Sequence, residues 1–320
     1  MIRAGIIGGA GYTAGELLRL LINHPEVEVA FVHSTSNAGA PVTDVHEGLI
    51  GDTDLTFADS YDLTACDVLF LCQGHGFSRK FWEENVMPEG LKVIDLAQDY
   101  RDESDGYVYG LTEVKREAVR SCSRLANPGC FATAIQLALL PLAAAGKLSG
   151  EVHVTGITGS TGAGVKPGST THFSWRNNNI SVYKAFEHQH LKEIKQTLSA
   201  LDGGKTHDIS FIPVRGDFAR GIFVMADVTT SMPLDEAVRL YKDFYADAEF
   251  THVSDRPVDL KQVVNTNKCV VSLEKHGDKL LILSAIDNLL KGASGQAVQN
   301  MNLMFALPER TGLALKPSAF

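Results

Sequence analysis

The sequence lacks the features of a disulfide-stapled, membrane-spanning or nucleic-acid-binding protein. It has five cysteines, an odd number with no C-x-x-C pair, which argues against a disulfide framework and against a structural zinc site. No apolar stretch reaches the roughly 18 to 20 residues that cross a bilayer; the richest, residues 131–145, contains Thr133 and Gln136. The net charge is −9 and no basic run occurs. We therefore expect neither a membrane nor nucleic acid as a partner.

The composition is that of an ordinary globular protein. The chain has 320 residues, of which 44% are apolar and 21% charged, and this length is enough for two domains. The first residues already read as a strand, so we expect no secretory signal and a cytoplasmic location. An acidic chain that binds an anionic substrate must gather its few cations locally.

The first hundred residues alternate between strands and helices. A short apolar strand from Arg3 leads into a glycine-rich turn and then a helix at residues 16–22, which His24-Pro25 ends. Further strands are expected at 27–32, 67–72 and 91–96, with a helical segment between the last two. Parallel strands separated by helices predict a Rossmann-type, doubly wound parallel sheet.

The pattern changes after Pro128. A helix is expected from about Cys130 to Ala145, followed by several strands and only a few helices, at the following residues: strands 151–156, 209–213, 221–229, 268–273 and 279–285, and helices from about 191 and at 233–246. This predicts an α+β catalytic and dimerisation domain with a mostly antiparallel sheet. We assign residues 1–129 and about 296–320 to a dinucleotide-binding domain and residues 130–295 to the catalytic domain. The last helix, 295–305, is able to pack on either.

The first turn has the form of a dinucleotide site. Residues 9–14, Gly-Ala-Gly-Tyr-Thr-Ala, match G-x-G-x-x-G/A after a strand and at the start of a helix. Glycines let the backbone approach a pyrophosphate, and the helix start offers unpaired N–H groups to it. The alternative is a plain tight turn. We expect cofactor contacts from Gly8, Gly9, Gly11, Tyr12, Thr13 and Ala14.

The end of the second strand favours NADP(H) over NAD. NAD enzymes usually place Asp or Glu there to bind the ribose 2′-hydroxyl. This chain has no carboxylate at that point and offers Ser34, Ser36 and Asn37, whose small donors suit a 2′-phosphate. The alternative is a polar loop without a cofactor contact.

Cys130 stands between a Pro-Gly turn and the first turn of an apolar helix. A free thiol has a pKa of about 8.5, and the dipole and open amides of a helix start favour the thiolate. Cys66 and Cys72 read as core residues, and Cys122 and Cys269 have no comparable setting. Since a lone cysteine at a helix start is more often structural than catalytic, position alone leaves both roles open.

The segment Asn127-Pro-Gly-Cys130-Phe-Ala-Thr-Ala134, followed by Pro141, resembles the active-site signature of the N-acetyl-gamma-glutamyl-phosphate reductase family, which is related to aspartate-semialdehyde dehydrogenase. The resemblance spans both expected domains; its other segments are residues 8–17, 24–25, 94–101, 109–113 and 287–302. It implies that Cys130 is a catalytic nucleophile. It also implies a small, anionic acyl phosphate as substrate and a homo-oligomer, either a dimer or a tetramer.

By the same resemblance, residues 182–190 correspond to the family's His-x-His segment. His188 carries over as the acid/base group and His190 as a residue that orients the substrate, although spacing alone does not separate the two. A His-x-His pair can also bind a metal, but no third ligand of matching pattern is present, so we expect no metal. The other alternative is a solvated loop before a helix.

The implied substrate carries a phosphate and a carboxylate. The glycine-rich segment 159–166 resembles the family's substrate loop, except that Val165 stands where the family commonly has Arg. Arg220-Gly221 fits an Arg-Gly pair of the family, and Arg215 stands where the family often has His. For each cation the alternative is a solvated surface charge, and this applies equally to Arg176 and Lys184. We expect substrate contacts from Asn127, Gly162, Lys166, His190, Arg215 and Arg220.

Three residues are expected beside the cofactor on the resemblance alone. Asn288 and Lys291 are expected to line the nicotinamide pocket. Gly76 lies in a loop, residues 73–76, that resembles a family loop near the cofactor, although the family usually has Pro where Gly74 stands.

The implied reaction converts N-acetyl-gamma-glutamyl phosphate into N-acetyl-glutamate 5-semialdehyde through a thioester on Cys130, with NADPH as reductant. The same chemistry on N-succinyl-glutamyl phosphate stays open, because a second carboxylate would demand different cations near Val165. Other acyl phosphates are also alternatives, and the motif disfavours aspartyl phosphate. An alternative of another class is a non-catalytic NADP-binding sensor, which would need a lost nucleophile or histidine.

Overall fold

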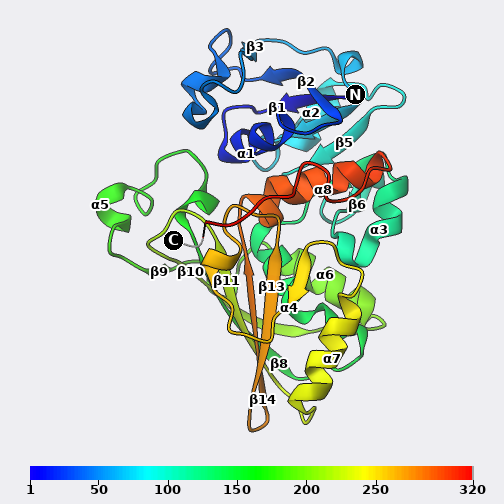
Figure 1. The fold of residues 1–320 in the computed structure, drawn as a ribbon, viewed down its shortest axis with the longest axis vertical. Helices are drawn as coiled ribbons and strands as arrows, with labels where there is room; N and C mark the ends of the chain where they lie inside the picture. Colours follow the sequence, from blue (N-terminus) through cyan, green and yellow to red (C-terminus); the bar gives the residue numbers. More distant parts are fainter. Residues whose placement is uncertain (319–320) are drawn as a thin grey trace. The chain divides into compact units, whose positions relative to one another are not determined.

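The computed structural model describes residues 1–318 and divides into two compact units (Figure 1). The first unit comprises Met1–Pro128 and Ala293–Ala314, and the second comprises Gly129–Gly292 and the chain from Leu315. Each unit contains one seven-stranded sheet. The chain therefore returns to the first unit at 293, and residues 315–318 group with the second unit rather than with the first. Within residues 1–318, no helix has both the length and the apolar character needed to cross a membrane.

The first unit is a parallel sheet in the order β3-β2-β1-β4-β5-β7-β6, with every pairing parallel. Its strands are β1 (Ile2–Ile7), β2 (Val27–His33), β3 (Phe57–Ala58), β4 (Val68–Leu71), β5 (Lys92–Asp95), β6 (Val108–Tyr109) and β7 (Arg124–Ala126). Its helices are α1 (Tyr12–Leu21), α2 (Phe77–Glu84), α3 (Thr112–Ser121) and α8 (Gly295–Met304), and α8 contacts both α1 and α3. The predicted Rossmann-type sheet is confirmed.

The strand order reverses between β1 and β4, which is where doubly wound sheets bind their ligands. The chain leaves β1 through Gly8, whose φ of +86° favours glycine. A Cβ at this position would lie 2.8 Å from the side chain of Gln73, in the loop after β4. The two loops therefore meet at the carboxyl edge of the sheet.

The second unit is a mixed sheet in the order β12-β13-β14-β11-β8-β10-β9. Its strands are β8 (Glu151–Thr158), β9 (Ser181–Val182), β10 (Asp208–Arg215), β11 (Ile222–Thr229), β12 (Thr251–Val253), β13 (Cys269–His276) and β14 (Lys279–Ile286). β8–β10 and β12–β13 pair in parallel and the other pairs are antiparallel, so the prediction of a mostly antiparallel sheet is confirmed. Its helices are α4 (Cys130–Ala144), α5 (Phe173–Arg176), α6 (Leu191–Leu201) and α7 (Leu234–Phe244).

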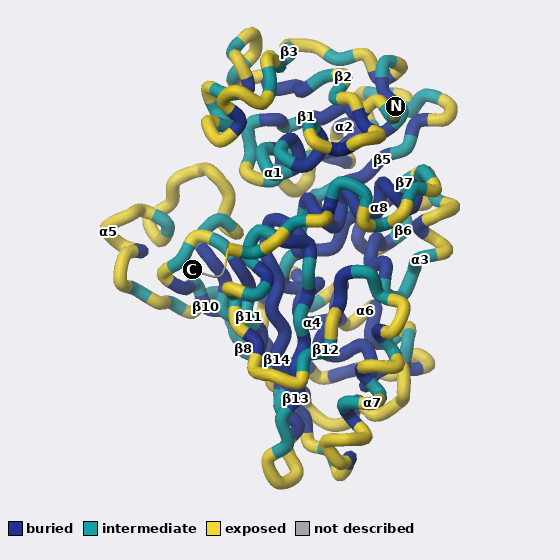
Figure 2. The backbone as a smooth tube through the Cα atoms, viewed as in Figure 1, coloured by how far each residue is buried: buried dark blue, intermediate teal, exposed yellow. Residues whose placement is uncertain are grey.

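Helix α4 is the centre of the second unit's core. Its residues from Phe131 to Ala143 are all buried (Figure 2), whereas Cys130 is half-buried and Ala144 is exposed. Pro141 has no N–H to donate to the carbonyl of Leu137. The hydroxyl of Tyr245 donates to that carbonyl instead, at 2.6 Å. A proline is therefore tolerated inside this helix, and α4 stays regular back to its first residue, Cys130.

Asp95 ends β5 with its carboxyl group fully buried in the first unit. Oδ1 accepts hydrogen bonds from Ser78 and from the amide of Ala97, both at 2.8 Å, whereas Oδ2 has no partner in the described part of the chain. Burial raises the pKa of Asp95 to about 6. The folded state therefore holds this proton more tightly than the unfolded chain, whose Asp has a pKa of about 3.9.

We predict that Asp95→Asn gains stability over the wild type as the pH rises. The folded protein binds more protons than the unfolded chain while the pH rises from the unfolded to the folded pKa, so the wild type loses stability over this range. The neutral amide has no such loss. Between about pH 5 and about pH 8, the difference in the free energy of unfolding between variant and wild type should change by roughly 1 to 2 kcal/mol in favour of the variant. Thermal melting checks this, with the exposed Asp54→Asn as control; equal shifts in both variants would contradict it.

Candidate active site

Cys130 is the first residue of α4 and the only one in its first three turns that is not fully buried. The residue before it, Gly129, has no side chain to cap the helix, and its amide donates to Oε2 of Glu193 at 3.0 Å. The first helical hydrogen bond runs from the amide of Thr133 to the carbonyl of Gly129, at 2.8 Å. The thiol therefore stands at the accessible, electropositive end of a buried helix.

The other four cysteines are poor nucleophile candidates. Burial raises the pKa of Cys66 and of Cys122 to about 11, and it also raises the pKa of Cys72. Cys269 is fully buried, with its sulfur 3.4 Å from Oγ of Ser284. Since only the thiolate is reactive, these settings leave Cys130 as the nucleophile candidate.

Two glycines give the start of α4 its close packing. A Cβ at Gly292 would lie 2.8 Å from the Cβ of Cys130, so residue 292 touches the nucleophile directly. A Cβ at Gly156, in β8, would lie 2.5 Å from the ring of Phe131. Any side chain at either position would displace the first turn of α4.

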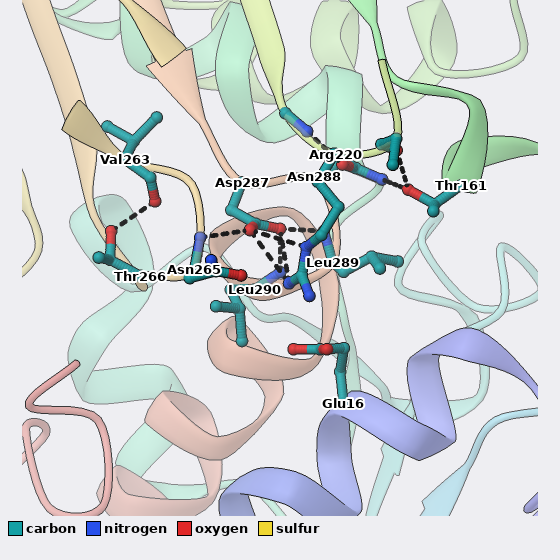
Figure 3. A network of polar contacts seen from close by, with 12 residues as sticks. Glu16, Thr161, Arg220, Val263, Asn265, Thr266, Asp287, Asn288, Leu289 and Leu290 are labelled. Carbon is teal, nitrogen blue, oxygen red and sulfur yellow. Dashed lines mark hydrogen bonds and ion pairs between the residues drawn. The ribbon is translucent and has the colours of Figure 1, made fainter. Parts of the chain in front are cut away.

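The turn that contains Gly292 depends on the buried carboxylate of Asp287 (Figure 3). Oδ1 accepts the amides of Leu289 and Leu290, and the backbone carbonyl of Asp287 accepts the amide of Gly292 at 2.9 Å. The chain then forms a π-helical turn, Leu290–Ser294, a form frequent at functional sites. Asp287 therefore holds the segment that touches Cys130.

Asp287 also fixes Arg220, which was predicted to bind substrate. Nε and Nη2 of Arg220 each donate to the carboxylate at 3.1 Å, in a fork geometry. The amide of Asn265 donates to the same carboxylate at 2.7 Å. The positive charge of Arg220 is thereby matched inside the protein. Any substrate contact must use the edge of the guanidinium that faces away from Asp287.

The two histidines of the His-x-His segment lie in different settings. Nε2 of His190 is 3.9 Å from Oε1 of Glu193, whose other oxygen binds the amide of Gly129. Nδ1 of His188 accepts the backbone amide of His190 at 3.3 Å. Burial, and to a lesser extent the charge of Lys184, lowers the pKa of His188 to about 4. Only His190 therefore faces a carboxylate, the partner that usually orients an acid/base histidine.

Tyr183 belongs to the site although the sequence analysis did not single it out. Its ring lies 5.9 Å from that of His188, and the guanidinium of Arg215 stacks on the Tyr183 ring at 4.6 Å from the ring centre. Burial first, and then the charge of Cys130, raise the pKa of Tyr183 to about 12. Tyr183 therefore stays a neutral hydroxyl near the thiol, and it connects Arg215, a predicted substrate residue, to that region.

Backbone hydrogen bonds to the segment 218–221 hold the glycine-rich segment after β8. The amides of Gly159, Ser160 and Thr161 donate to carbonyls of Gly221, Phe218 and Ala219, so these amides are not open to an anion. Gly162 and Lys166 are exposed beyond them. An anion held here would therefore be met by side chains rather than by the first amides of the loop.

Several predicted residues use their polar groups inside the protein. The amide of Asn127 donates to the carbonyl of Ala293 and accepts from Asn300. Asn288 donates to Thr161 and accepts the amide of Gly221. The backbone amide of Gly76 donates to Asp99 at 2.7 Å. These groups brace the chain, and Lys291 is fully buried; the ligand contacts predicted for all four stay predictions.

In the first unit the predicted cofactor residues lie at the start of α1 and at the end of β2. Gly11 caps α1 without any side-chain bond, which leaves the first-turn amides of Tyr12, Thr13 and Ala14 uncapped. A Cβ at Gly9 would lie 2.4 Å from Val32, so only glycine fits beside β2. At the end of β2, Asn37 donates to the hydroxyls of Ser34 and Ser36, at 3.2 and 2.9 Å. Among residues 1–318 no three His, Cys, Asp or Glu side chains group as metal ligands.

Family models match most of the chain. Residues 3–122 match the semialdehyde dehydrogenase NAD binding domain, and residues 130–288 match the semialdehyde dehydrogenase dimerisation domain. The second match begins at Cys130.

Curated relatives are similar over their full length. N-acetyl-gamma-glutamyl-phosphate reductase of Bacteroides thetaiotaomicron is 63% identical over 100% of both chains, and the protein of the same name from Flavobacterium johnsoniae is 52% identical over 100% of both. Among solved structures, aspartate semialdehyde dehydrogenase II of Vibrio cholerae, complexed with ASA, has a TM-score of 0.74 at 17% identity and covers 96% of this chain and 98% of its own. Aspartate semialdehyde dehydrogenase of Candida albicans, with NADP, has a TM-score of 0.72 at 16% identity, with coverage of 96% and 99%. At such identities the structures show the fold.

We predict that Gly292→Ala slows alkylation of Cys130 by iodoacetamide about tenfold or more, because the new methyl group displaces the thiol from the helix start. Mass spectrometry of the peptide that contains Cys130 measures the rate. Gly48→Ala is the control, since a Cβ at 48 meets nothing within 4 Å. Unchanged alkylation in a folded Gly292→Ala protein would show that the close approach has no effect on the thiol.

Proposed function

The chain belongs to the N-acetyl-gamma-glutamyl-phosphate reductase family, and from this premise we propose how its residues carry out the reaction of that family. The protein is an NADP-dependent reductase that converts N-acetyl-gamma-glutamyl phosphate into N-acetyl-glutamate 5-semialdehyde and phosphate, a step of arginine biosynthesis. The observation that carries the proposal is the accessible thiol of Cys130 at the start of a buried helix, where the next residue, Phe131, packs against the ring of His188.

Cys130 is the nucleophile. Its sulfur attacks the acyl carbon, the carbon–oxygen bond to the phosphate breaks, and phosphate leaves with that electron pair. The product of this step is a thioester on Cys130. After reduction, the carbon–sulfur bond breaks, the sulfur recovers its electron pair and the aldehyde is released. Covalent capture thereby divides one difficult conversion into two displacements.

The proton of the thiol is exchanged by His190 and Glu193 in this scheme. The motif favours His188 for this role, but two observations support His190: its Nε2 lies 3.9 Å from the carboxylate of Glu193, and that carboxylate also binds the amide of Gly129, one residue before the nucleophile. A carboxylate that faces the ring stabilises the imidazolium formed when the thiol is deprotonated.

NADP(H) fits the first unit. The uncapped amides at the start of α1 and the glycines after β1 suit the pyrophosphate, and the hydroxyls of Ser34 and Ser36 with the amide of Asn37 suit a 2′-phosphate. When bound, NADPH supplies the hydride that reduces the thioester carbonyl. The chain runs from Ala126, at the end of β7, to Cys130 in four residues. Cys130 and the last residues of this sheet are thus close neighbours in the sequence.

The substrate is a small molecule, and the protein is proposed to act as a homo-oligomer. The region 130–288 matches a domain described as a dimerisation domain. In the second unit, Phe223, Met225, Val270 and Leu281 form a partly exposed apolar group, which a second copy would cover. The choice between dimer and tetramer stays open, and the cytoplasmic location stays a prediction.

We predict that Cys130→Ser lowers turnover by at least about 1,000-fold while NADP binding is unchanged, because the residues expected to hold the pyrophosphate and the 2′-phosphate lie in the first unit and the hydroxyl is a far weaker nucleophile. NADPH absorbance measures turnover and cofactor fluorescence measures binding. Cys122→Ser, at a half-buried thiol whose pKa burial raises, serves as the control. Near-normal turnover of Cys130→Ser would exclude the thioester.

We predict that the reverse reaction proceeds with N-acetyl-glutamate 5-semialdehyde, NADP and phosphate. The assay compares the N-acetyl substrate with its N-succinyl counterpart and with aspartate semialdehyde through kcat/KM. A preference for the succinyl compound would assign Arg215, whose guanidinium lies over the ring of Tyr183, to a second carboxylate. Absence of turnover with every semialdehyde would favour a non-catalytic NADP-binding protein.

A further inference from the structure

His188 has a buried ring with one nitrogen left open. The side chain is 5% exposed, and the rings of Phe131, Tyr183, His190 and Phe211 surround it at centroid distances of 5.7, 5.9, 4.6 and 5.4 Å. Phe131 directly follows the nucleophile, and the charge of Cys130 acts on Tyr183. His188 therefore shares its neighbours with the reactive sulfur.

The hydrogen bonds of His188 determine which nitrogen carries the proton. Nδ1 accepts the backbone N–H of His190 at 3.3 Å, and a nitrogen that accepts a hydrogen bond carries no proton. The proton of the neutral ring is therefore on Nε2. Within residues 1–318, Nε2 donates to no protein group, and it is not among the side-chain atoms sealed from solvent. This N–H is a donor without an acceptor in the protein.

The groups around the ring keep it neutral. Phe131 from α4 and Phe211 from β10 are apolar, and Tyr183 has a pKa that burial raises to about 12. Lys184 places a positive charge nearby, and the carboxylate of Glu193 faces His190. Burial then lowers the pKa of His188 to about 4, so its cation is a minor species at neutral pH.

The segment before His188 is held in a fixed and strained conformation. Lys184 and Phe186 adopt φ values of 45° and 64°, in the left-handed region that such residues seldom occupy. The amide of Phe186 donates to Phe211 at 2.8 Å and that of Tyr183 to Pro213 at 3.1 Å, which fastens the segment to β10. Strain of this kind persists where the surroundings fix a functional geometry.

We propose that His188 is a fixed hydrogen-bond donor whose Nε2–H binds the oxygen of the carbonyl captured by Cys130. The proposal rests on the proposed reductase function and differs from the acid/base role that the sequence motif implies. When sulfur attacks, the π electron pair of the carbonyl moves onto oxygen, and the N–H meets the charge that develops there. No proton leaves Nε2, and the carbon–oxygen bond to phosphate breaks as the carbonyl re-forms. The same donor serves the oxygen again after reduction.

Matched variants test this role. The amide nitrogen of a glutamine reaches a position similar to Nε2 and also donates, whereas leucine has a similar volume and no donor. We expect His188→Gln to keep kcat within roughly tenfold of the wild type, and His188→Leu to lose about 100- to 1,000-fold. Equal losses in the two variants, with both proteins folded, would overturn the proposal.

Two further measurements distinguish a donor from a base. In ¹⁵N-histidine-labelled protein, which has 11 histidines, His188→Gln assigns the signal of His188. We expect the proton to stay on Nε2 and the signal to be constant from about pH 5.5 to about pH 8. We also expect His188→Leu to leave the pH profile of Cys130 alkylation unchanged. A titration within this range, a proton on Nδ1, or a shifted alkylation profile would each contradict the donor role.

The outcomes separate this proposal from the reductase function. If the wild type turns over no semialdehyde, the function fails, whereas the ring's protonation is still read from the labelled protein. If the wild type is active and His188 titrates, the function stands and the donor role fails. The Cys130→Ser protein provides the reference for the turnover measurement and for the protonation measurement.

Discussion

The buried carboxylate of Asp287 is the constraint on which the site in the second unit depends. It binds the guanidinium of Arg220 and the amides of Asn265, Leu289 and Leu290, and it lies at the start of the turn that brings Gly292 against Cys130. A charge taken out of water is costly unless it is matched, and here one arginine and several N–H groups match it. Because a single side chain holds both a cation and the backbone beside the thiol, the two cannot move independently.

Much of this fold follows from the sequence because its signals are local. A strand, a glycine turn and an amphipathic helix identify the first unit, and a long apolar run identifies α4 as a core helix. Short strands carry no comparable signal, so β3, β6, β7, β9 and β12 are absent from the sequence-based description. Two or three residues give no readable period, and these strands exist because neighbouring strands pair with them.

The site is predictable to a similar extent and for a similar reason. Cys130 is recognisable because a helix start and a Pro-Gly turn adjoin it in the chain. Tyr183 is a functional neighbour only through tertiary contacts, so no local pattern identifies it. A motif also does not distinguish a residue that contacts a ligand from one that holds the chain in place. The side-chain oxygen and nitrogen of Asn288 both have protein partners. A glutamate three residues after His190 on the same helix was the one available signal for a histidine–carboxylate pair.

Charge decides how an acidic chain can hold an anionic substrate. Arg176 is buried and donates to the carbonyl of Arg215 and to Ser181, and Arg220 is matched by Asp287. Both cations therefore serve the architecture first. Among the cations considered for substrate binding, Lys166, Lys184 and Arg215 have no carboxylate partner within residues 1–318, and of these only Arg215 is stacked on a residue near the thiol. Since a planar guanidinium already oriented on an aromatic ring loses little freedom when it binds a carboxylate, selection among acyl groups should depend on Arg215 more than on the flexible lysines.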